Sequence, residues 1–297
     1  MPSASNLVLL WNRSEEWKAR LEMVEKAERF VYISVFYIEY DVFGKEFLLA
    51  LERALARGVK IYLLIDSFGQ WLAGHVMPKK IRRALQERLE NLRKKDAKII
   101  FYKPPRRTQR MLGGGQHVKI QLSDSGVALF GSSNVSHSSY IAWNDFSALF
   151  QGSIVLEFIE TLNALGLNAS VEHQEFLKNK IQTLQKNVSL GYLFFDPNYS
   201  QGILGPLLWR KKNPITKEML SLIENAQASI QITSFYFKPT QILLDALIAA
   251  AKRGVRVEIY HSHRKALDAT DLAWIAAAVK FKKMLSVGIN IFENLHG

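Results

Sequence analysis

The chain has 297 residues, 48% of them hydrophobic and 22% charged, which is enough apolar material for one large or two ordinary domains and excludes wholesale disorder. The absence of cysteine excludes disulfides, thiolate metal sites and cysteine nucleophiles. The formal net charge of +12 predicts a polyanionic partner: nucleic acid, anionic lipid or a phosphorylated substrate.

The first part of the chain alternates strand and helix patterns. Residues 30–38 are mostly β-branched and aromatic, typical of a buried strand, and this longest apolar run is too short to span a bilayer. No signal-peptide pattern precedes it, so we expect a soluble intracellular chain. Residues 47–56 are apolar at helical spacing and end at Arg57-Gly58, a helix stop, and residues 59–65 predict the next strand.

A strongly basic segment follows. Residues 78–95 predict a long helix that starts at Pro78, and residues 98–102 predict another strand. From Lys79 to Arg110 there are thirteen Lys and Arg against three Asp and Glu, a net charge of +10. Such a run is often only a solvated helix face, but here it directly precedes a motif. Strands that alternate with helices imply a mostly parallel sheet covered by helices.

The segment after the basic run contains six specified residues at fixed spacing, H-x-K-x4-D-x6-G-S-x-N. They are His117, Lys119, Asp124, Gly131, Ser132 and Asn134. Residues 117–122 and 127–130 alternate like strands, and residues 124–126 are typical of a hairpin turn between them. Asp124 is counted with the catalytic set because it belongs to the motif, although tying the hairpin is the role we favour for it.

The spacing within the motif brings reactive side chains to one place. His117 and Lys119 lie two apart on a strand, so both side chains project from one face. Ser132 and Asn134 repeat this spacing after the next strand. An imidazole that attacks or shuttles protons, a cation and two hydrogen-bonding side chains suit a phosphoryl group, because charge builds on its non-bridging oxygens during transfer.

The chain also contains an internal repeat, since residues 8–62 match residues 206–259. The offset is 198–199 early and 196 late, so one loop is shorter in the second copy. The duplicated Trp11 and Trp209 are interpreted as core anchors. Residues 153–186 predict helices that bridge the copies. The second copy predicts the same order of elements as the first: strand 229–237, helix 241–252, strand 255–260, helix 268–286 and strand 287–292.

The motif resembles that of the phospholipase D superfamily, whose members carry two such motifs, one in each lobe. The resemblance implies an α/β fold of two pseudo-symmetric lobes, each a mixed, mostly parallel sheet flanked by helices. It implies a two-step phosphodiester exchange without metal or other cofactor. One histidine forms a phosphohistidine, and the other donates and accepts the proton. The resemblance also implies that Asp145, eleven residues after Asn134, orients the histidine.

Within the superfamily, the chain is most similar to bacterial cardiolipin synthases and related phosphatidyltransferases. The residues that carry this similarity are Tyr40-Asp41-x-x-Gly44, Arg57-Gly58-Val59-Lys60, and Trp143-Asn144-Asp145 with Gly152. The similarity runs from about residue 8 to 160 and from 206 to the end. We expect no counterpart of the membrane-spanning N-terminal region common in those synthases, and the loop at residues 113–115 is unusually glycine-rich.

The resemblance places a second motif at the end of the chain. His296 stands in Leu-His, the start of many second motifs in the family, so we expect it to be the second catalytic histidine, with the chain ending before its lysine. The alternative is a fortuitous terminal histidine. His263-x-Lys265 also fits the start of the motif, but no Asp or G-S-x-N follows at the required spacing. We interpret it as surface or as polar residues near the site.

These observations predict a first lobe over residues 1–168, a helical or irregular linker over 169–202 and an incomplete second lobe over 203–297. The favoured function is phosphatidyl transfer on anionic phospholipid, by a cytoplasmic chain peripheral to the inner face of the membrane. One alternative is a phosphodiesterase that acts on nucleic acid, with the basic segment along the phosphate backbone. The other is an inactive single-motif chain, unless a homodimer pairs two first motifs.

Overall fold

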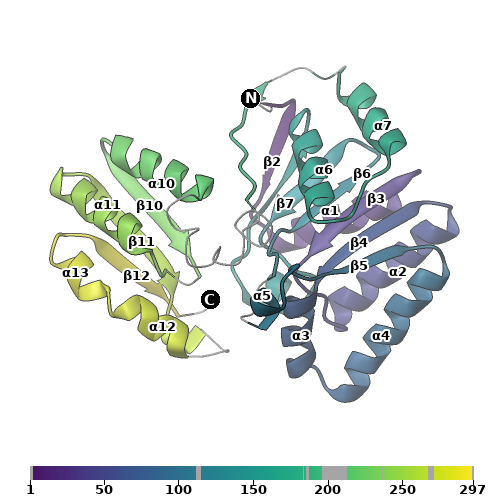
Figure 1. The fold of residues 1–297 in the computed structure, drawn as a ribbon, viewed down its shortest axis with the longest axis horizontal. Coiled ribbons are helices and arrows are strands. Elements are labelled where there is room, and N and C mark those ends of the chain that lie inside the picture. Colours follow the sequence, from purple (N-terminus) through teal and green to yellow (C-terminus); the bar gives the residue numbers. More distant parts are fainter. Residues whose placement is uncertain are drawn as a thin grey trace. The chain divides into compact units, whose positions relative to one another are not determined.

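The computed structural model describes residues 3–111, 115–182, 184, 187–195, 213–235, 237–266 and 271–295. The chain divides into two compact units, Met1–Tyr199 and Ser200–Gly297, which are described separately (Figure 1). The first unit holds the whole H-x-K-x4-D-x6-G-S-x-N motif. The lobe and linker boundaries expected from the sequence stay a prediction.

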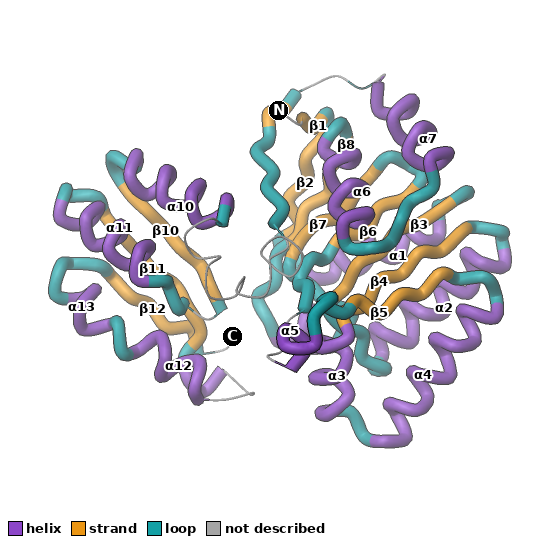
Figure 2. The backbone as a smooth tube through the Cα atoms, viewed as in Figure 1, coloured by secondary structure: helices purple, strands orange, loops and turns teal. Residues whose placement is uncertain are grey.

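The first unit is built on a seven-stranded sheet in the order β2-β8-β7-β6-β3-β4-β5 (Figure 2). Its strands are β2 (Asn6–Leu10), β3 (Phe30–Val35), β4 (Lys60–Asp66), β5 (Lys98–Tyr102), β6 (Ile120–Ser123), β7 (Val127–Gly131) and β8 (Ser147–Gln151). A separate two-stranded ribbon joins β1 (Ser3–Ala4) to β9 (Val188–Ser189). β3, β4 and β5 are parallel, and the other neighbours are antiparallel. The expected mixed sheet is confirmed, although antiparallel pairings outnumber parallel ones here.

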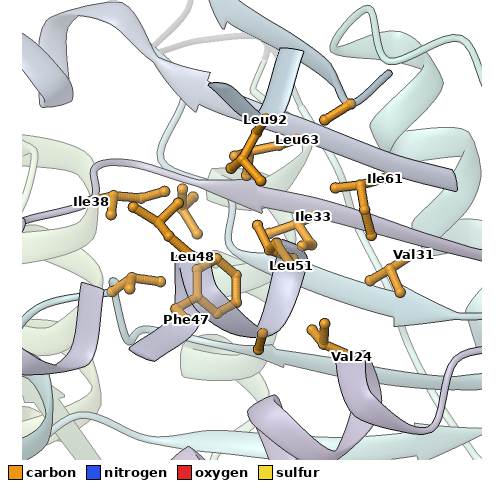
Figure 3. Close-up of a cluster of buried hydrophobic side chains, with 14 of the residues drawn as sticks. Val24, Val31, Ile33, Ile38, Phe47, Leu48, Leu51, Ile61, Leu63 and Leu92 are labelled. Carbon is orange, nitrogen blue, oxygen red and sulfur yellow. The ribbon is translucent and has the colours of Figure 1, made fainter. Parts of the chain in front are cut away.

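Helices cover both faces of this sheet because its central strands are apolar on both sides. The helices are α1 (Arg13–Glu25), α2 (Val42–Ala56), α3 (Ser67–Val76), α4 (Lys79–Lys94), α5 (Arg107–Met111), α6 (Ile154–Ala164) and α7 (Val171–Gln182), with a π-helical turn at Ser138–Ala142. Val31, Ile33 and Val35 of β3 pack with α1, α2 and α4, whereas Phe30 and Tyr32 pack with α6 and α7. Figure 3 shows the first cluster, in which side chains of α2 meet Ile33.

Local sequence signals set the ends of α2. It begins at Val42, five residues before the expected start, because Oδ1 of Asp41 accepts a hydrogen bond from the Gly44 N–H at 2.9 Å. Gly58 follows the helix with φ +88°, a left-handed conformation that is cheap for glycine. Gly254, which the repeat aligns with Gly58, has φ +90°. Each helix therefore ends at the Arg-Gly pair, as the sequence predicts for α2.

The second unit contains a parallel sheet in the order β10-β11-β12. Its elements are α10 (Pro214–Asn225), β10 (Ser229–Ser234), α11 (Gln241–Lys252), β11 (Arg256–Ser262), a 3-10 turn (Arg264–Ala266), α12 (Asp271–Ala278), α13 (Phe281–Leu285) and β12 (Asn290–Asn294). The strand order matches β3-β4-β5. The register matches too, since Phe30 pairs with Lys60, and Ser229 pairs with Arg256. The offsets of the repeat, 199 and 196, relate these two pairs.

In the described part of the second unit, helices cover only one face of the sheet. Leu244, Leu247 and Ile248 of α11 lie in the core on that side. On the opposite face Tyr260 is 37% exposed and Phe292 is 45% exposed, and their rings stack with centroids 4.9 Å apart. Within these residues β10 pairs only with β11, whereas its counterpart β3 also pairs with β6. The same strand pattern therefore has different surroundings in the two units.

Some sequence expectations are corrected by the structure. Trp11 is 71% exposed and contacts Phe146, so its interpretation as a core anchor is wrong, and Trp209 lies outside the described residues. The single helix expected over residues 268–286 is instead α12 and α13. A turn separates them, and there the Lys280 ammonium donates to the backbone oxygen of Pro239. None of the described helices is long and apolar enough to cross a bilayer.

Candidate active site

His117 and Lys119 lie together on the extended segment that leads into β6. The strand begins at Ile120, three residues later than expected. The Nζ atom of Lys119 is 3.1 Å from Nδ1 of His117 and donates to the His117 backbone oxygen at 2.9 Å. Lys119 is only 2% exposed, whereas the His117 side chain is exposed. The pair thus presents an imidazole to solvent with an ammonium behind it.

Phe36, directly after β3, holds this pair in place and joins it to the end of the motif. The His117 ring meets the Phe36 ring edge to face with centroids 4.5 Å apart, and the Lys119 ammonium lies 5.6 Å from the Phe36 centroid. The Phe36 N–H donates to Oδ1 of Asn134 at 3.3 Å. Asn134 is 4% exposed. The predicted site residues His117, Lys119 and Asn134 therefore lie together around Phe36.

Ser132 and Asp145 form a second, adjoining pair. The Ser132 hydroxyl donates to Oδ1 of Asp145 at 2.5 Å and accepts from the Phe146 N–H at 2.9 Å. The other carboxylate oxygen of Asp145 is buried without a hydrogen bond among the described residues. Its charge raises the pKa of Lys119, so the carboxylate acts electrostatically on the ammonium. The hydrogen bond that Asp145 makes here is to Ser132, and its predicted role in orienting the histidine stays a prediction.

The surroundings lower the pKa of both members of the central pair. Although part of the His117 side chain is exposed, the protein atoms packed around the ring desolvate it, and this effect, followed by the charge of Lys119, lowers the pKa of His117 to about 4. Desolvation also lowers the pKa of Lys119 to about 7, with Arg20 adding to the effect and Asp145 and Asp66 opposing it. At neutral pH the imidazole is therefore uncharged, which leaves one ring nitrogen free for nucleophilic or general-base chemistry, and the Lys119 amine is at the middle of its titration.

Binding of an oxyanion at this site is expected to take up a proton above pH 7. Sulfate, which does not titrate near neutrality, requires the charged form of Lys119, so its affinity should fall about tenfold per pH unit above pH 7. Below pH 7 the ammonium is already present, and no uptake is expected. Isothermal titration calorimetry in buffers of different ionisation enthalpy measures the uptake, and Lys119→Met should remove it. Equal affinity at pH 6 and pH 8.5 without uptake would contradict the lowered pKa.

The structure does not bring Asp124 to the site. Ser123 of β6 pairs with Val31, whereas Ile120 pairs with Ser34, so Asp124 and Lys119 lie at opposite ends of this strand. Oδ2 of Asp124 accepts from the backbone N–H groups of Glu28 at 3.0 Å and Arg29 at 2.7 Å. Asp124 therefore fixes the hairpin to the start of β3, which is the structural role that the sequence favoured.

Asp124→Ala is expected to destabilise the first unit without touching the chemistry. Two backbone N–H groups, in hydrogen bonds that are partly buried, lose their charged acceptor, at a cost of about 1–3 kcal/mol in the free energy of unfolding. Asp124→Asn keeps one acceptor oxygen and should cost less. Urea unfolding followed by circular dichroism measures both. A variant with wild-type stability but impaired turnover per folded molecule would return Asp124 to the catalytic set.

Sequence reasoning missed the residues that position the segment before His117. Asp66 is fully buried and accepts from the N–H groups of Gln116 and Gly69, both at 2.8 Å. Desolvation raises its pKa, and these hydrogen bonds oppose the rise. A Cβ atom on Gly115 would lie 2.7 Å from Oδ1 of Asp66, so a side chain at this position would displace the Asp66 carboxylate. Gln116 in turn accepts from the Val118 N–H at 2.7 Å.

A buried ionic network beneath the site was also missed. Arg20 of α1 is 1% exposed, and its guanidinium donates to the Tyr140 hydroxyl at 2.8 Å and lies 3.5 Å from Glu16. Glu16 is fully buried and accepts from the Ser133 hydroxyl at 2.8 Å. Ser133 lies between the two predicted site residues of the G-S-x-N segment. In the sequence, Glu16 and Arg20 are only two opposite charges four residues apart, a spacing that exposed ion pairs on helices also have, so it does not reveal that they are buried.

The second motif lies beyond what the structure describes. His296 is outside the described residues, so its predicted catalytic role stays a prediction. His263 lies after β11 in the second unit, where its Nδ1 accepts from the Lys265 N–H at 3.1 Å. Among the described residues no group of three or more His, Asp or Glu side chains is arranged to hold a metal ion.

Comparison with known proteins identifies relatives along most of the chain. Residues 21–163 and 219–296 match the family model described as cardiolipin synthase, PLD-like domain. The chain is 24% identical over 300 residues to the cardiolipin synthase of Geobacillus kaustophilus, covering 98% of this chain and 55% of that protein. It is 24% identical over 300 residues to the probable cardiolipin synthase of Bacillus subtilis, covering 99% and 55%. The chain thus spans about half the length of the curated relatives it matches.

Solved structures share the fold. The phosphatidylserine synthase of Haemophilus influenzae superposes with a TM-score of 0.67 at 15% identity, covering 96% of this chain and 72% of that one. The polyphosphate kinase of Porphyromonas gingivalis gives a TM-score of 0.52 at 11% identity, covering 87% and 38%. Identities this low establish the architecture alone.

Proposed function

The chain belongs to the phospholipase D-like domain family of cardiolipin synthases, and on this premise we propose that it transfers phosphatidyl groups between alcohols. The observation that carries the proposal is the pairing of an exposed, uncharged imidazole with a buried ammonium 3.1 Å away. An incoming phosphodiester meets His117 first and finds Lys119 behind it. This order suits a nucleophile and the cation that receives the charge of the phosphoryl oxygens.

In the first step, Nε2 of His117 attacks the phosphorus of the donor lipid. The P–O bond to the leaving alcohol breaks, the P–N bond of a phosphohistidine forms, and the leaving oxygen takes a proton from a second histidine, for which His296 is the candidate. Attack at Nε2 requires the ring proton on Nδ1. The Lys119 ammonium therefore leaves Nδ1 and moves onto a non-bridging phosphoryl oxygen.

In the second step, an incoming alcohol gives its proton to the second histidine and attacks the same phosphorus. The P–N bond to His117 breaks, and the imidazole is regenerated. The side-chain N–H of Asn134 supports a phosphoryl oxygen from the adjoining turn, and the Ser132 hydroxyl would do so after its hydrogen bond to Asp145 is exchanged for one to phosphate. With phosphatidylglycerol as both donor and acceptor, the products are cardiolipin and glycerol.

Trapping the intermediate tests this proposal. Vesicles of phosphatidylglycerol labelled in the phosphatidyl phosphorus are mixed with the full chain, and the reaction is quenched in base, in which phosphohistidine survives. We expect labelled protein whose label is released by acid, together with labelled cardiolipin. Vesicles without phosphatidylglycerol are the control. Absence of both the label and the lipid product would refute phosphatidyl transfer.

A nucleic-acid phosphodiesterase is the second candidate, favoured by the basic segment. Lys79, Lys80 and Arg83 of α4 and Arg107 of α5 are exposed, as a phosphate-binding track requires. Cleavage of plasmid or single-stranded DNA that weakens steeply with salt, without turnover of phosphatidylglycerol, would favour this candidate.

A homodimer that pairs two His117 residues is tested by measuring the same activities at several protein concentrations, because the specific activity of a dimer would rise with concentration.

A further inference from the structure

Helix α3 presents its large apolar side chains to solvent. Phe68, Trp71, Leu72, His75 and Val76 follow the spacing of one helix face and are called the α3 stripe here. Trp71 is 56% exposed, Leu72 is 42% exposed and Val76 is 76% exposed. The rings of Phe68 and Trp71 stack at 5.7 Å, and Trp71 meets His75 at 4.2 Å. Apolar residues at this spacing usually form the buried face of a helix, but in α3 they form the solvent-exposed face.

Small residues on the opposite face fix this orientation. Gly69, Ala73 and Gly74 are the buried residues of α3. A Cβ atom on Gly69 would lie 2.4 Å from the backbone oxygen of Phe36, so the helix can approach the sheet this closely only through glycine. The large side chains cannot turn inward without moving the helix away from the sheet. The close packing of α3 against the sheet therefore keeps the α3 stripe exposed to solvent.

The segment formed by α3 and the start of α4 contains basic residues but no acidic ones. Residues 67–86 contain no Asp or Glu, and Lys79, Lys80 and Arg83 are exposed in the first turns of α4, which follows α3 directly. An aromatic and aliphatic patch next to a cationic turn matches the headgroup boundary of an anionic bilayer, where apolar side chains enter the acyl region and lysines contact headgroups. A nucleic acid would use the cations but gain nothing from exposed Leu72 and Val76.

Helix α3 is also tied rigidly to the candidate active site. Its capping residue Asp66 binds the N–H of Gln116, the neighbour of His117. The Gln70 side chain accepts from the Ile38 N–H at 3.0 Å and donates to the Ile38 oxygen at 2.9 Å. A surface bound by α3 would therefore be held at a fixed distance from His117.

We propose that the α3 stripe and the adjoining Lys79–Arg83 turn dock the first unit on an anionic membrane surface. The inference rests on the proposed function, because phosphatidyl substrates reside in that surface. Docking by an element anchored beside His117 would bring headgroups to the imidazole.

The chain contains no cysteine, so a single introduced cysteine can report on this surface. Leu72→Cys and Val76→Cys are labelled with an environment-sensitive NBD dye and titrated with vesicles of phosphatidylglycerol and phosphatidylcholine. We expect a blue shift and a several-fold rise in emission with phosphatidylglycerol vesicles, and little change with phosphatidylcholine alone. Lys18→Cys, on α1 and 78% exposed in its side chain, is the matched control and should not respond.

Charge and apolar contact are separated by two further variants measured by vesicle flotation. Lys79→Gln with Lys80→Gln should weaken binding about twenty-five-fold, about fivefold for each lysine, and the loss should shrink at high salt. Trp71→Ser with Leu72→Ser should weaken binding at least about tenfold, independently of salt. Glu172→Gln, an exposed change of charge on α7, should leave binding unchanged or slightly stronger.

Several results would overturn the inference. NBD dyes at residues 72 and 76 that stay unchanged while the protein floats with vesicles would place the membrane contact elsewhere. A blue shift without vesicles that grows with protein concentration would make the α3 stripe an interface between chains, and a shift with DNA but not vesicles would favour nucleic acid. Turnover of a submicellar short-chain phosphatidylglycerol separates the two proposals. Absence of this turnover in the wild type counts against the proposed function. The dye experiment tests the membrane contact of the α3 stripe independently of turnover.

Discussion

Alanine at His117 is expected to abolish phosphatidyl labelling of the protein and to reduce lipid turnover at least about a thousandfold, because no other group then attacks phosphorus. The His117 side chain is exposed and contributes one ring contact to Phe36, so the folded structure should survive. Circular dichroism and urea unfolding check this. Acid-labile label per folded molecule is the decisive measurement, since it isolates the first chemical step.

The chain offers a matched control for this substitution. His263 stands in the same local pattern, His-x-Lys, but in the second unit and without the remainder of the motif. His263→Ala should keep full labelling and turnover. Full labelling of His117→Ala would show that the nucleophile lies elsewhere. Loss of activity in both variants would show that the second unit supplies a reacting group, and it would favour the interpretation of His263 as a polar residue near the site.

Glu16→Gln is expected to cost about 3–5 kcal/mol in the free energy of unfolding, because it leaves the Arg20 guanidinium buried next to a neutral group. Glu16 is fully buried and Arg20 is 1% exposed, so solvent cannot replace the lost carboxylate. The remaining acceptors of Arg20 are the Tyr140 hydroxyl, the Gln121 amide oxygen and the Ser133 backbone oxygen, and all three are neutral. Thermal and urea unfolding measure the loss.

The same helix supplies the comparison. Glu22 of α1 is 3.0 Å from Lys26, and both side chains are largely exposed, so Glu22→Gln should change stability by less than about 1 kcal/mol. The double variant Glu16→Leu with Arg20→Met removes both buried charges and should be more stable than Glu16→Gln. Equal effects of Glu16→Gln and Glu22→Gln would mean that water reaches the network.

The parts of the molecule that follow from local pattern could be predicted from the sequence. The β-branched and aromatic residues within 30–38 form β3, Gly58 ends α2, and the motif spacing places His117 beside Lys119. These features depend on neighbours a few residues away. The buried network could not be predicted, because Arg20 meets Tyr140 across 120 residues of sequence and no local signal marks either as a partner.

Two further misses have physical reasons. The contact between Asp66 and Gln116 joins residues 50 apart, at the ends of strands that become neighbours of β3 only in the folded sheet. The α3 stripe has the spacing of a buried face, and only the packing of Gly69 against Phe36 turns it outward. Asp124 shows the reverse case, since the turn pattern around it favoured a structural role and the fold uses it to tie the hairpin to the start of β3.

The different neighbours of β3 and β10 have a consequence for amide hydrogen exchange. The amides of β3 lie between two hydrogen-bonded strands and under helices on both faces, so they should exchange only when the first unit unfolds globally. Those of β10 border a single strand within the described second unit, beneath one helical layer. The β10 amides should exchange through local openings, at rates orders of magnitude higher. The aligned pairs Phe30–Lys60 and Ser229–Arg256 allow the exchange rates of the two copies to be compared position by position.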